Sequence, residues 1–457
     1  MEEKVVGTFS RRKSLASLAD RPAGAPQLEV VRVGRMGQRR PSAATGFAWS
    51  IAGLVTVQLS QWAVIVFLSR LGSPEMVGHY ALGLAISAPV ILVAGLALRT
   101  VQVTDVGPLY VFNDYLRLRI VGMVTALGVI GAVVPFLGAG KEVVVLLVSV
   151  AKALDGVGDT YWGLFQRHER MRPIGVSMIT NGLVTVVAVI ALLLMTASVE
   201  WAAVGSLIGS LAGSIGYCVW AARPLGATSS STVTLTGSWA VRPLAASALH
   251  RMARLAVVAA PLGLSSGLVS LSANLPRYLL GHELGSAALG IFAALAYVVL
   301  AANVLFAAIS QLLLPKLTRL VAAGNLVAFT RLTLGFLLST LCWGAVALVA
   351  VAFVGPATIR LIYGPPYEKH GALLILLAAV SVLSGMVYFL NAALCVLRKF
   401  GNQLAASVLL VTVAGIGAHL LIPRYGLIGA AWSMMIAVGA DVLLKSLMLK
   451  VALANEN

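Results

Sequence analysis

Long apolar stretches alternate with short polar segments along most of this chain. Each stretch holds about 20 mostly apolar residues, the length that an α-helix needs to cross a hydrocarbon layer of roughly 30 Å. Backbone groups in such a layer must be hydrogen-bonded within the protein, and a helix does this inside a single segment. The pattern therefore predicts an all-α, polytopic membrane protein of about twelve spans, at 45–69, 77–99, 120–139, 143–165, 173–197, 201–221, 255–280, 286–311, 333–354, 372–396, 401–421 and 427–449.

Two of the predicted helical hairpins repeat each other across half of the chain. The first contains GLVTVQLSQ from Gly53 and LGSPEMVGHYALGLA from Leu71, and the second contains GLVSLSANL from Gly267 and LGSAALGIFAALA from Leu284, at an offset of about 213 residues. Internal repeats of membrane helices are typical of alternating-access transporters, whose site lies between the repeats. We therefore expect two lobes of six helices each. The fourth span is the weakest by hydropathy, but without it the repeat would lose its register.

Composition and charge agree with a membrane protein. The chain is 59% hydrophobic and only 11% charged, whereas soluble domains carry about 25% charged residues. With the N-terminus placed in the cytoplasm, the predicted inner loops collect most of the Arg and Lys residues, as the positive-inside rule requires, and both termini are cytoplasmic. The net charge of +17 is then spread over short loops beside the bilayer, so we expect contacts with anionic lipid and none with nucleic acid.

The same pattern divides the chain into five parts. Residues 1–43 are basic and poor in apolar residues, so they are expected to form a disordered cytoplasmic arm. The N-terminal lobe covers 44–221, a polar cytoplasmic linker covers 222–254, the C-terminal lobe covers 255–450, and a short tail covers 451–457.

The residues that would signal catalysis or a cofactor are sparse. The three cysteines lie inside predicted spans and the six histidines lie mostly at span ends or in loops, without metal-ligand spacing. There is no phosphate-binding loop of the Walker type. We therefore expect no cofactor, no metal and no catalytic residues.

Several motifs resemble a known family of membrane proteins. AKALDGVGDTYWGLFQRHERM from Ala151 resembles the fourth helix of oligosaccharide flippases, the O-antigen and polysaccharide translocases of the MATE-like superfamily that transports drugs, oligosaccharidyl lipids and polysaccharides. PLGLSSGLVSLSANLPRYLLGHELGSAALGIFAALAY from Pro261 resembles the seventh and eighth helices of that family. Shorter similarities are LSRLGSPEMVGHYALG from Leu68, LALRTVQVTD from Leu96 and YGLIGAAWS from Tyr425. The long basic arm departs from the family pattern.

The resemblance implies two six-helix lobes in a V around a central cavity, in a bacterial inner membrane. The implied function is translocation of a polyprenyl-pyrophosphate-linked oligosaccharide from the cytoplasmic to the outer leaflet, with the polysaccharide assembly machinery as a further partner. One alternative is a drug/cation antiporter of the same fold, which needs a membrane carboxylate in the N-terminal lobe. A membrane polysaccharide polymerase and a non-transporting scaffold are further alternatives, although no long outer loop offers catalytic residues for the former.

Polar residues inside the spans are the candidate substrate contacts, because a charge at the centre of a membrane helix costs about 2.5–3.5 kcal/mol on insertion scales. In the seventh span, Arg277 follows Asn274 and Pro276. A guanidinium group matches phosphate oxygens, so Arg277 and Asn274 are expected to contact the pyrophosphate or the sugar. Alternatively, Arg277 extends to the outer lipid headgroups.

Further candidates lie in the first lobe. Gln58 and Gln61 lie one helical turn apart in the first span and suit a hydroxyl-rich sugar, although hydrogen bonds between helices explain them equally well. Arg70 and Arg99 end the first and second spans. They either anchor the helices in the headgroups or guide a charged substrate.

Two groups of charges are spaced for contact on one helix face. Lys152, Asp155 and Asp159 share one face of the fourth span, and they either line the cavity, relay ions, or form a self-neutralising pair that faces protein. Asp441 and Lys445 are four residues apart in the twelfth span, and we expect a buried ion pair there.

Overall fold

The computed structural model describes residues 43–105, 110–138, 140–225, 246–397 and 403–454. These described residues form helices and contain no strand, which confirms the predicted all-α class. Nearly all of the predicted basic arm, most of the predicted linker and the end of the predicted tail lie outside the described residues.

The helices of the first half follow the predicted spans. They are α1 (Ala43–Leu71), α2 (Pro74–Gly95), α3 (Leu98–Thr104), α4 (Phe112–Val133), the 3-10 segment η1 (Val134–Leu137), α5 (Glu142–Arg167), α6 (Met171–Thr196), α7 (Val199–Ser210), the π-helical segment η2 (Leu211–Tyr217), α8 (Cys218–Ala222) and the 3-10 segment η3 (Arg223–Leu225).

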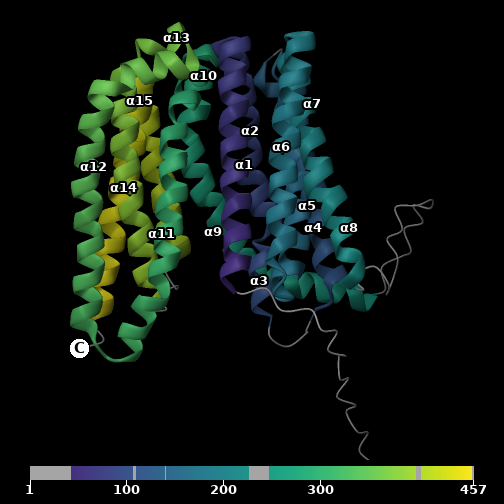
Figure 1. The fold of residues 1–457 in the computed structure, drawn as a ribbon, viewed down its shortest axis with the longest axis vertical. Helices are drawn as coiled ribbons and strands as arrows, with labels where there is room; N and C mark the ends of the chain where they lie inside the picture. Colours follow the sequence, from purple (N-terminus) through teal and green to yellow (C-terminus); the bar gives the residue numbers. More distant parts are fainter. Residues whose placement is uncertain (1–42, 106–109, 139, 226–245, 398–402, 455–457) are drawn as a thin grey trace, which may run out of the picture. The chain divides into compact units, whose positions relative to one another are not determined.

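The second half is built in the same way, with longer helices. They are α9 (Ala246–Glu283), α10 (Gly285–Leu295), α11 (Tyr297–Ala322), α12 (Leu326–Tyr363), the short α13 (Pro365–Glu368), α14 (Gly371–Val396) and α15 (Gln403–Ala454). Figure 1 shows these helices running roughly parallel to one another, with α13 and α3 near opposite ends of the bundle. We call these the α13 end and the α3 end.

Four predicted spans differ in detail from the observed helices. The second span is broken between α2 and α3, where Leu96 and Ala97 both have positive φ angles, of 52° and 48°. The eighth span is divided at Ala296 into α10 and α11. The last two spans are joined in α15, which bends sharply at Gly426 (φ 57°, ψ −130°), three residues after Pro423. Glycine tolerates this backbone conformation because it has no side chain.

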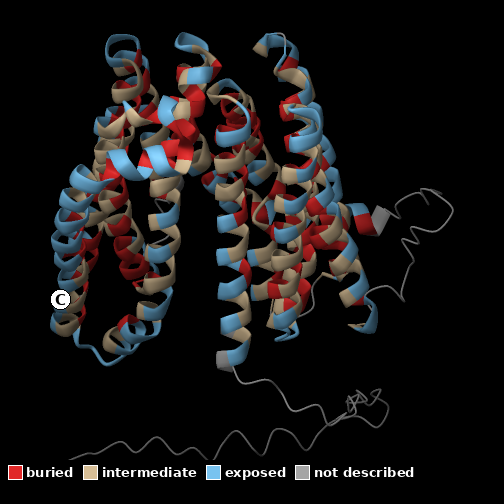
Figure 2. Ribbon diagram, turned by 45° about the horizontal axis from the view of Figure 1, so that its top comes forward, coloured by how far each residue is buried: buried red, intermediate tan, exposed pale blue. Residues whose placement is uncertain are grey.

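Ten helices in the described part of the chain are long and apolar enough to cross a membrane. Helix α5 is not among them because of its charged residues, and α15 is counted once although it consists of two helical segments. The structure is therefore compatible with twelve spans. Large apolar side chains are exposed on the bundle, such as Phe136 at 87%, Phe353 at 82% and Met195 at 81%, and Figure 2 shows buried residues gathered on the inward sides of the helices. This distribution suits a protein surrounded by lipid.

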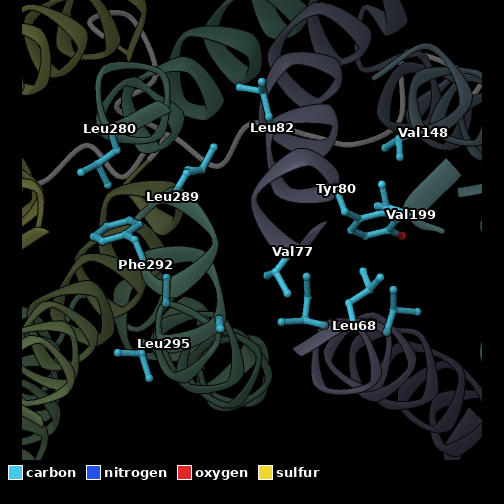
Figure 3. Close-up of a cluster of buried hydrophobic side chains, with 14 of the residues drawn as sticks. Leu68, Val77, Tyr80, Leu82, Val148, Val199, Leu280, Leu289, Phe292 and Leu295 are labelled. Atoms are coloured by element: carbon cyan, nitrogen blue, oxygen red, sulfur yellow. The ribbon is translucent and has the colours of Figure 1, made fainter. Parts of the chain in front are cut away.

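The two halves use equivalent packing partners. In the first half, α1 packs on α6 and α5 packs on α2 and α4; in the second half, α9 packs on α15 and α14 packs on α11 and α12. Between the halves, α2 packs along α9 and α10. A cluster of buried apolar side chains crosses this boundary, with Leu68 and Val77 from the first half and Leu280, Leu289 and Phe292 from the second (Figure 3).

Candidate functional site

The first group of predicted site residues forms an ion-paired cluster on α5. Lys152 Nζ lies 3.0 Å from Asp155 Oδ2, which is the self-neutralising pair that the sequence offered as one alternative. The other oxygen of Asp155 accepts hydrogen bonds of 2.8 Å from Asn181 Nδ2 on α6 and from Ser214 Oγ on η2. The π-helical turn of η2 brings Ser214 to this position, and such turns are frequent at functional sites.

Asp159 belongs to a second cluster, which contains two arginines. Its Oδ1 lies 3.2 Å from Arg99 Nη1 and its Oδ2 lies 3.0 Å from Arg119 Nη2. Arg99 also donates to Gln166 Oε1 and lies over the ring of Trp162. The single carboxylate of Asp159 thus neutralises only part of the charge of two guanidinium groups.

Arg277 lies in α9 and has no carboxylate partner in the described part of the chain. Its Nη1 donates a 2.8 Å hydrogen bond to Asn274 Oδ1, so the two residues predicted together do lie together. Its Nε is buried and has no hydrogen-bond partner. A buried donor left unpaired costs about 1–3 kcal/mol, and more for a charged group. Arg277 is therefore a cation inside the bundle with donor capacity left over.

Two tyrosines, Tyr80 and Tyr297, pack in the apolar cluster that crosses the boundary between the halves. Tyr80 on α2 shares a hydrogen bond of 2.9 Å with the hydroxyl of Ser206. Tyr297 begins α11 and is half-buried. Sequence reasoning missed these tyrosines because a tyrosine within an apolar span is equally well explained by packing.

The two glutamines of α1 stay separate from these groups. Gln58 and Gln61 are both half-buried, and neither amide makes a hydrogen bond to another described residue. Their hydrogen-bonding capacity is therefore not used by other helices, which was the alternative explanation for them.

Arg70 has a different environment from the one expected of a substrate contact. Its guanidinium group donates to the carbonyls of Arg360, Leu361 and Ile362, where α12 ends at the α13 end. Cations at a helix C-terminus are favourable because the last carbonyls are otherwise unpaired. Arg70 thus ties α1 to α12.

Two further ion pairs lie within the helices. Asp441 and Lys445 lie 2.6 Å apart, which confirms the predicted pair. Arg251 Nε and Nη2 donate to the two oxygens of Asp114, at 2.8 and 3.2 Å. This bidentate pair connects α9 to α4, and sequence reasoning missed it because its partners are 137 residues apart.

The charges inside the bundle are not balanced, and the excess is positive. Each aspartate in the middle of a described span is ion-paired, namely Asp155, Asp159 and Asp441, and so is Asp114 near the start of α4. By contrast, Arg277 is unpaired and Arg99 shares its partner with Arg119. The interior has an excess of positive charge, which attracts anions and repels cations.

The fold and these polar groups define a multi-pass membrane protein of the MATE-like transporter fold. Residues 43–321 match the family described as polysaccharide biosynthesis protein, and the chain belongs to that family. It is 26% identical over 399 residues to the capsular polysaccharide biosynthesis protein CapF of Staphylococcus aureus, covering 86% of this chain and 95% of CapF. The resemblance noted from the sequence is thereby confirmed.

Two solved structures have a similar fold. One is an inward-facing multidrug resistance MATE family transporter of the MOP superfamily, with a TM-score of 0.66 and 15% identity, covering 89% of this chain and 98% of that one. The other is the lipid II flippase MurJ in an inward closed conformation, with a TM-score of 0.66 and 12% identity, covering 88% of this chain and 87% of that one. At these identities the likeness is one of fold.

Proposed function

We propose that this protein moves a polyprenyl-pyrophosphate-linked oligosaccharide from the cytoplasmic to the outer leaflet of a bacterial inner membrane. Membership of the polysaccharide biosynthesis family supports the pathway, and the fold shared with a lipid II flippase supports the kind of movement. In this proposal the two halves of the chain act as rocking lobes, both termini are cytoplasmic, and the protein is a transporter and not an enzyme.

The observation that carries the proposal is the unpaired guanidinium group of Arg277. A cation within a membrane protein is costly unless it has a partner, and the described residues offer Arg277 only the amide oxygen of Asn274. A pyrophosphate would supply that partner, since a guanidinium group forms two parallel hydrogen bonds to phosphate oxygens. The substrate would then bind to a half-buried group that Asn274 already orients.

The same charges argue against the drug/cation antiporter. That activity needs a carboxylate free to exchange a coupling ion for a cationic drug. Asp155 and Asp159, the carboxylates of α5, are both held in ion pairs. A cationic drug would have to displace Lys152 or an arginine and then share the interior with Arg277.

A complementation experiment tests the proposal. In a strain that lacks the gene, lipid-linked repeat units should accumulate inside the membrane and surface polysaccharide should be lost. The wild-type gene should restore export, Arg277→Ala should fail to do so, and Arg277→Lys should restore it partly, because lysine keeps the charge but loses the planar fork.

Arg360→Ala is the matched control. Arg360 is 67% exposed and lies 3.7 Å from Glu368 at the α13 end, so its loss should leave export intact. Full export by both Arg277 variants would exclude the proposed contact. Normal surface polysaccharide in the deletion strain, together with hypersensitivity to cationic drugs, would replace the flippase proposal with the antiporter.

A further inference from the structure

A groove of about 830 Å³ lies between the end of α11 and the beginning of α12, at the α3 end. This volume falls within the roughly 300–1,000 Å³ of ligand sites. The residues that line it come only from these two helices and the turn between them: Lys316, Leu320, Asn325, Val327, Ala328, Arg331, Leu332, Gly335, Phe336 and Ser339. The groove is thus separate from Arg277 and from the charges of α5.

One part of the groove is cationic. Lys316 reaches it from α11 and Arg331 reaches it from α12, and neither forms an ion pair with any described carboxylate. Asn325 begins α12, and its side-chain oxygen is already used by the backbone N–H of Ala328 at 2.9 Å. Two cations from different helices therefore face one space without an anion between them.

The rest of the groove is apolar. Leu332 and Phe336 form its wall, and a side chain added at Gly335 would meet nothing within 4 Å. The hydroxyl of Ser339 is satisfied by the carbonyl of Phe336 at 2.9 Å. From Arg331 to Ser339 the helix rises by about 12 Å. The apolar part of the groove therefore offers an acyl chain a surface of about that length along α12.

We propose that this groove binds an anionic phospholipid of the bilayer, with its phosphate between Lys316 and Arg331 and one acyl chain along Gly335 and Phe336. Basic pockets between membrane helices bind the headgroups of anionic lipids, and the apolar part gives the acyl chain a fitted surface. The charge complementarity selects an anionic lipid over a zwitterionic one, and the apolar part selects a lipid over a free phosphate ion. The proposal does not depend on the transported substrate.

Lipid binding to the purified full-length protein in detergent tests the proposal. Phosphatidylglycerol should raise the thermal unfolding midpoint more than phosphatidylcholine does, and native mass spectrometry should detect the bound lipid. Each cation near a membrane surface contributes about 1 kcal/mol, so the double variant K316Q/R331Q, which loses both, should bind phosphatidylglycerol about 30-fold more weakly.

Two further variants separate the parts of the site. Arg319 lies in α11, like Lys316, but does not line the groove. The variant Arg319→Gln should therefore bind the lipid like the wild type. Gly335→Leu fills the open space and should weaken lipid binding while both cations remain. The proposal is overturned if K316Q/R331Q binds no more weakly than Arg319→Gln, or if inorganic phosphate gives the same stabilisation as phosphatidylglycerol.

Discussion

Gly290 on α10 faces Gly78 on α2 so closely that a β-carbon added to Gly290 would lie 2.8 Å from the backbone nitrogen of Gly78. A β-carbon on Gly78 would in turn collide with the backbone carbonyl of Ser286. The two glycines occupy corresponding places in the internal repeat, since Gly78 lies five residues and Gly290 four residues after a Leu-Gly-Ser sequence. Their mutual contact is what a two-fold relation between the halves produces.

Substitution of these glycines should therefore separate α2 from α10. Gly290→Ala should destabilise the protein by about 1–3 kcal/mol, as overpacking does, and Gly78→Ala should do the same. Thermal unfolding of the purified protein would measure this as a lower midpoint. Gly131→Ala in α4 is the control, since an added β-carbon there meets nothing within 4 Å, and its midpoint should not fall. Equal midpoints for all three variants would contradict the close approach.

A hydrogen bond between side chains joins α1 to the end of α12. Trp62 Nε1 donates to the hydroxyl of Tyr363 at 2.9 Å, near the carbonyls that Arg70 binds. Tyr363→Phe removes this bond, which contributes about 0.5–1.5 kcal/mol, and keeps the ring. If the bond holds the α13 end closed, a cysteine placed at buried Leu68, in a background without the native cysteines, should react with a polar maleimide roughly 2–10-fold faster in the variant.

Tyr367 provides the control for that experiment. Its ring lies 5.5 Å from the ring of Tyr363, and its buried hydroxyl has no hydrogen-bond partner. Tyr367→Phe removes a hydroxyl from the same place without breaking a bond, so the labelling rate should stay unchanged. Equal rates in both variants would show that the Trp62 bond does not hold this end.

Asp159 is the shared anion of two arginines, so its loss should cost more than the loss of an ordinary pair. Asp159→Asn would leave Arg99 and Arg119 facing each other, and Arg119 is only 6% exposed. Breaking a buried ion pair from one side typically costs about 3–5 kcal/mol. We expect a strongly lowered unfolding midpoint and partial rescue by a second change, Arg119→Met, which removes the buried charge.

The control for Asp159 is a carboxylate in a weak surface contact. Glu75 is 67% exposed and lies 3.9 Å from His79, so Glu75→Gln should change stability by no more than about 0.5 kcal/mol. If Asp159→Asn behaves like Glu75→Gln, or if Arg119→Met makes it worse, the shared ion pair does not stabilise the fold.

The pair between Arg251 and Asp114 should stabilise the contact of α9 with α4. Asp114 is 1% exposed, and Arg251→Ala would leave its carboxylate buried without a cation. The thermal midpoint should fall in the order wild type, Arg251→Lys, Arg251→Ala, because lysine keeps the charge but only one point of contact. Arg254→Ala, on the same helix and without an ion pair to described residues, should leave the midpoint unchanged. Any other order would contradict this account.

Local patterns were sufficient for the secondary structure and for contacts within one helix. Apolar length predicted most of the spans, because every backbone group in lipid must be paired within a helix. Helix α5, the weakest span by hydropathy, was predicted from the register of the internal repeat. Helical spacing alone placed Lys445 beside Asp441 and Lys152 beside Asp155, since residues three or four apart are neighbours on a helix.

Only the tertiary structure decided which groups meet across helices. Asp159 pairs with Arg99 and Arg119, Arg251 with Asp114, and Arg70 with the end of α12, although 40 to 292 residues separate these partners along the chain. No periodicity encodes such pairs, because they depend on how whole helices pack. The sequence by itself determined a helical membrane protein with an internal repeat and a set of candidate charges. The packing of the helices then determined that the carboxylates in the middle of the described spans are neutralised and that Arg277 is left as an unpaired cation.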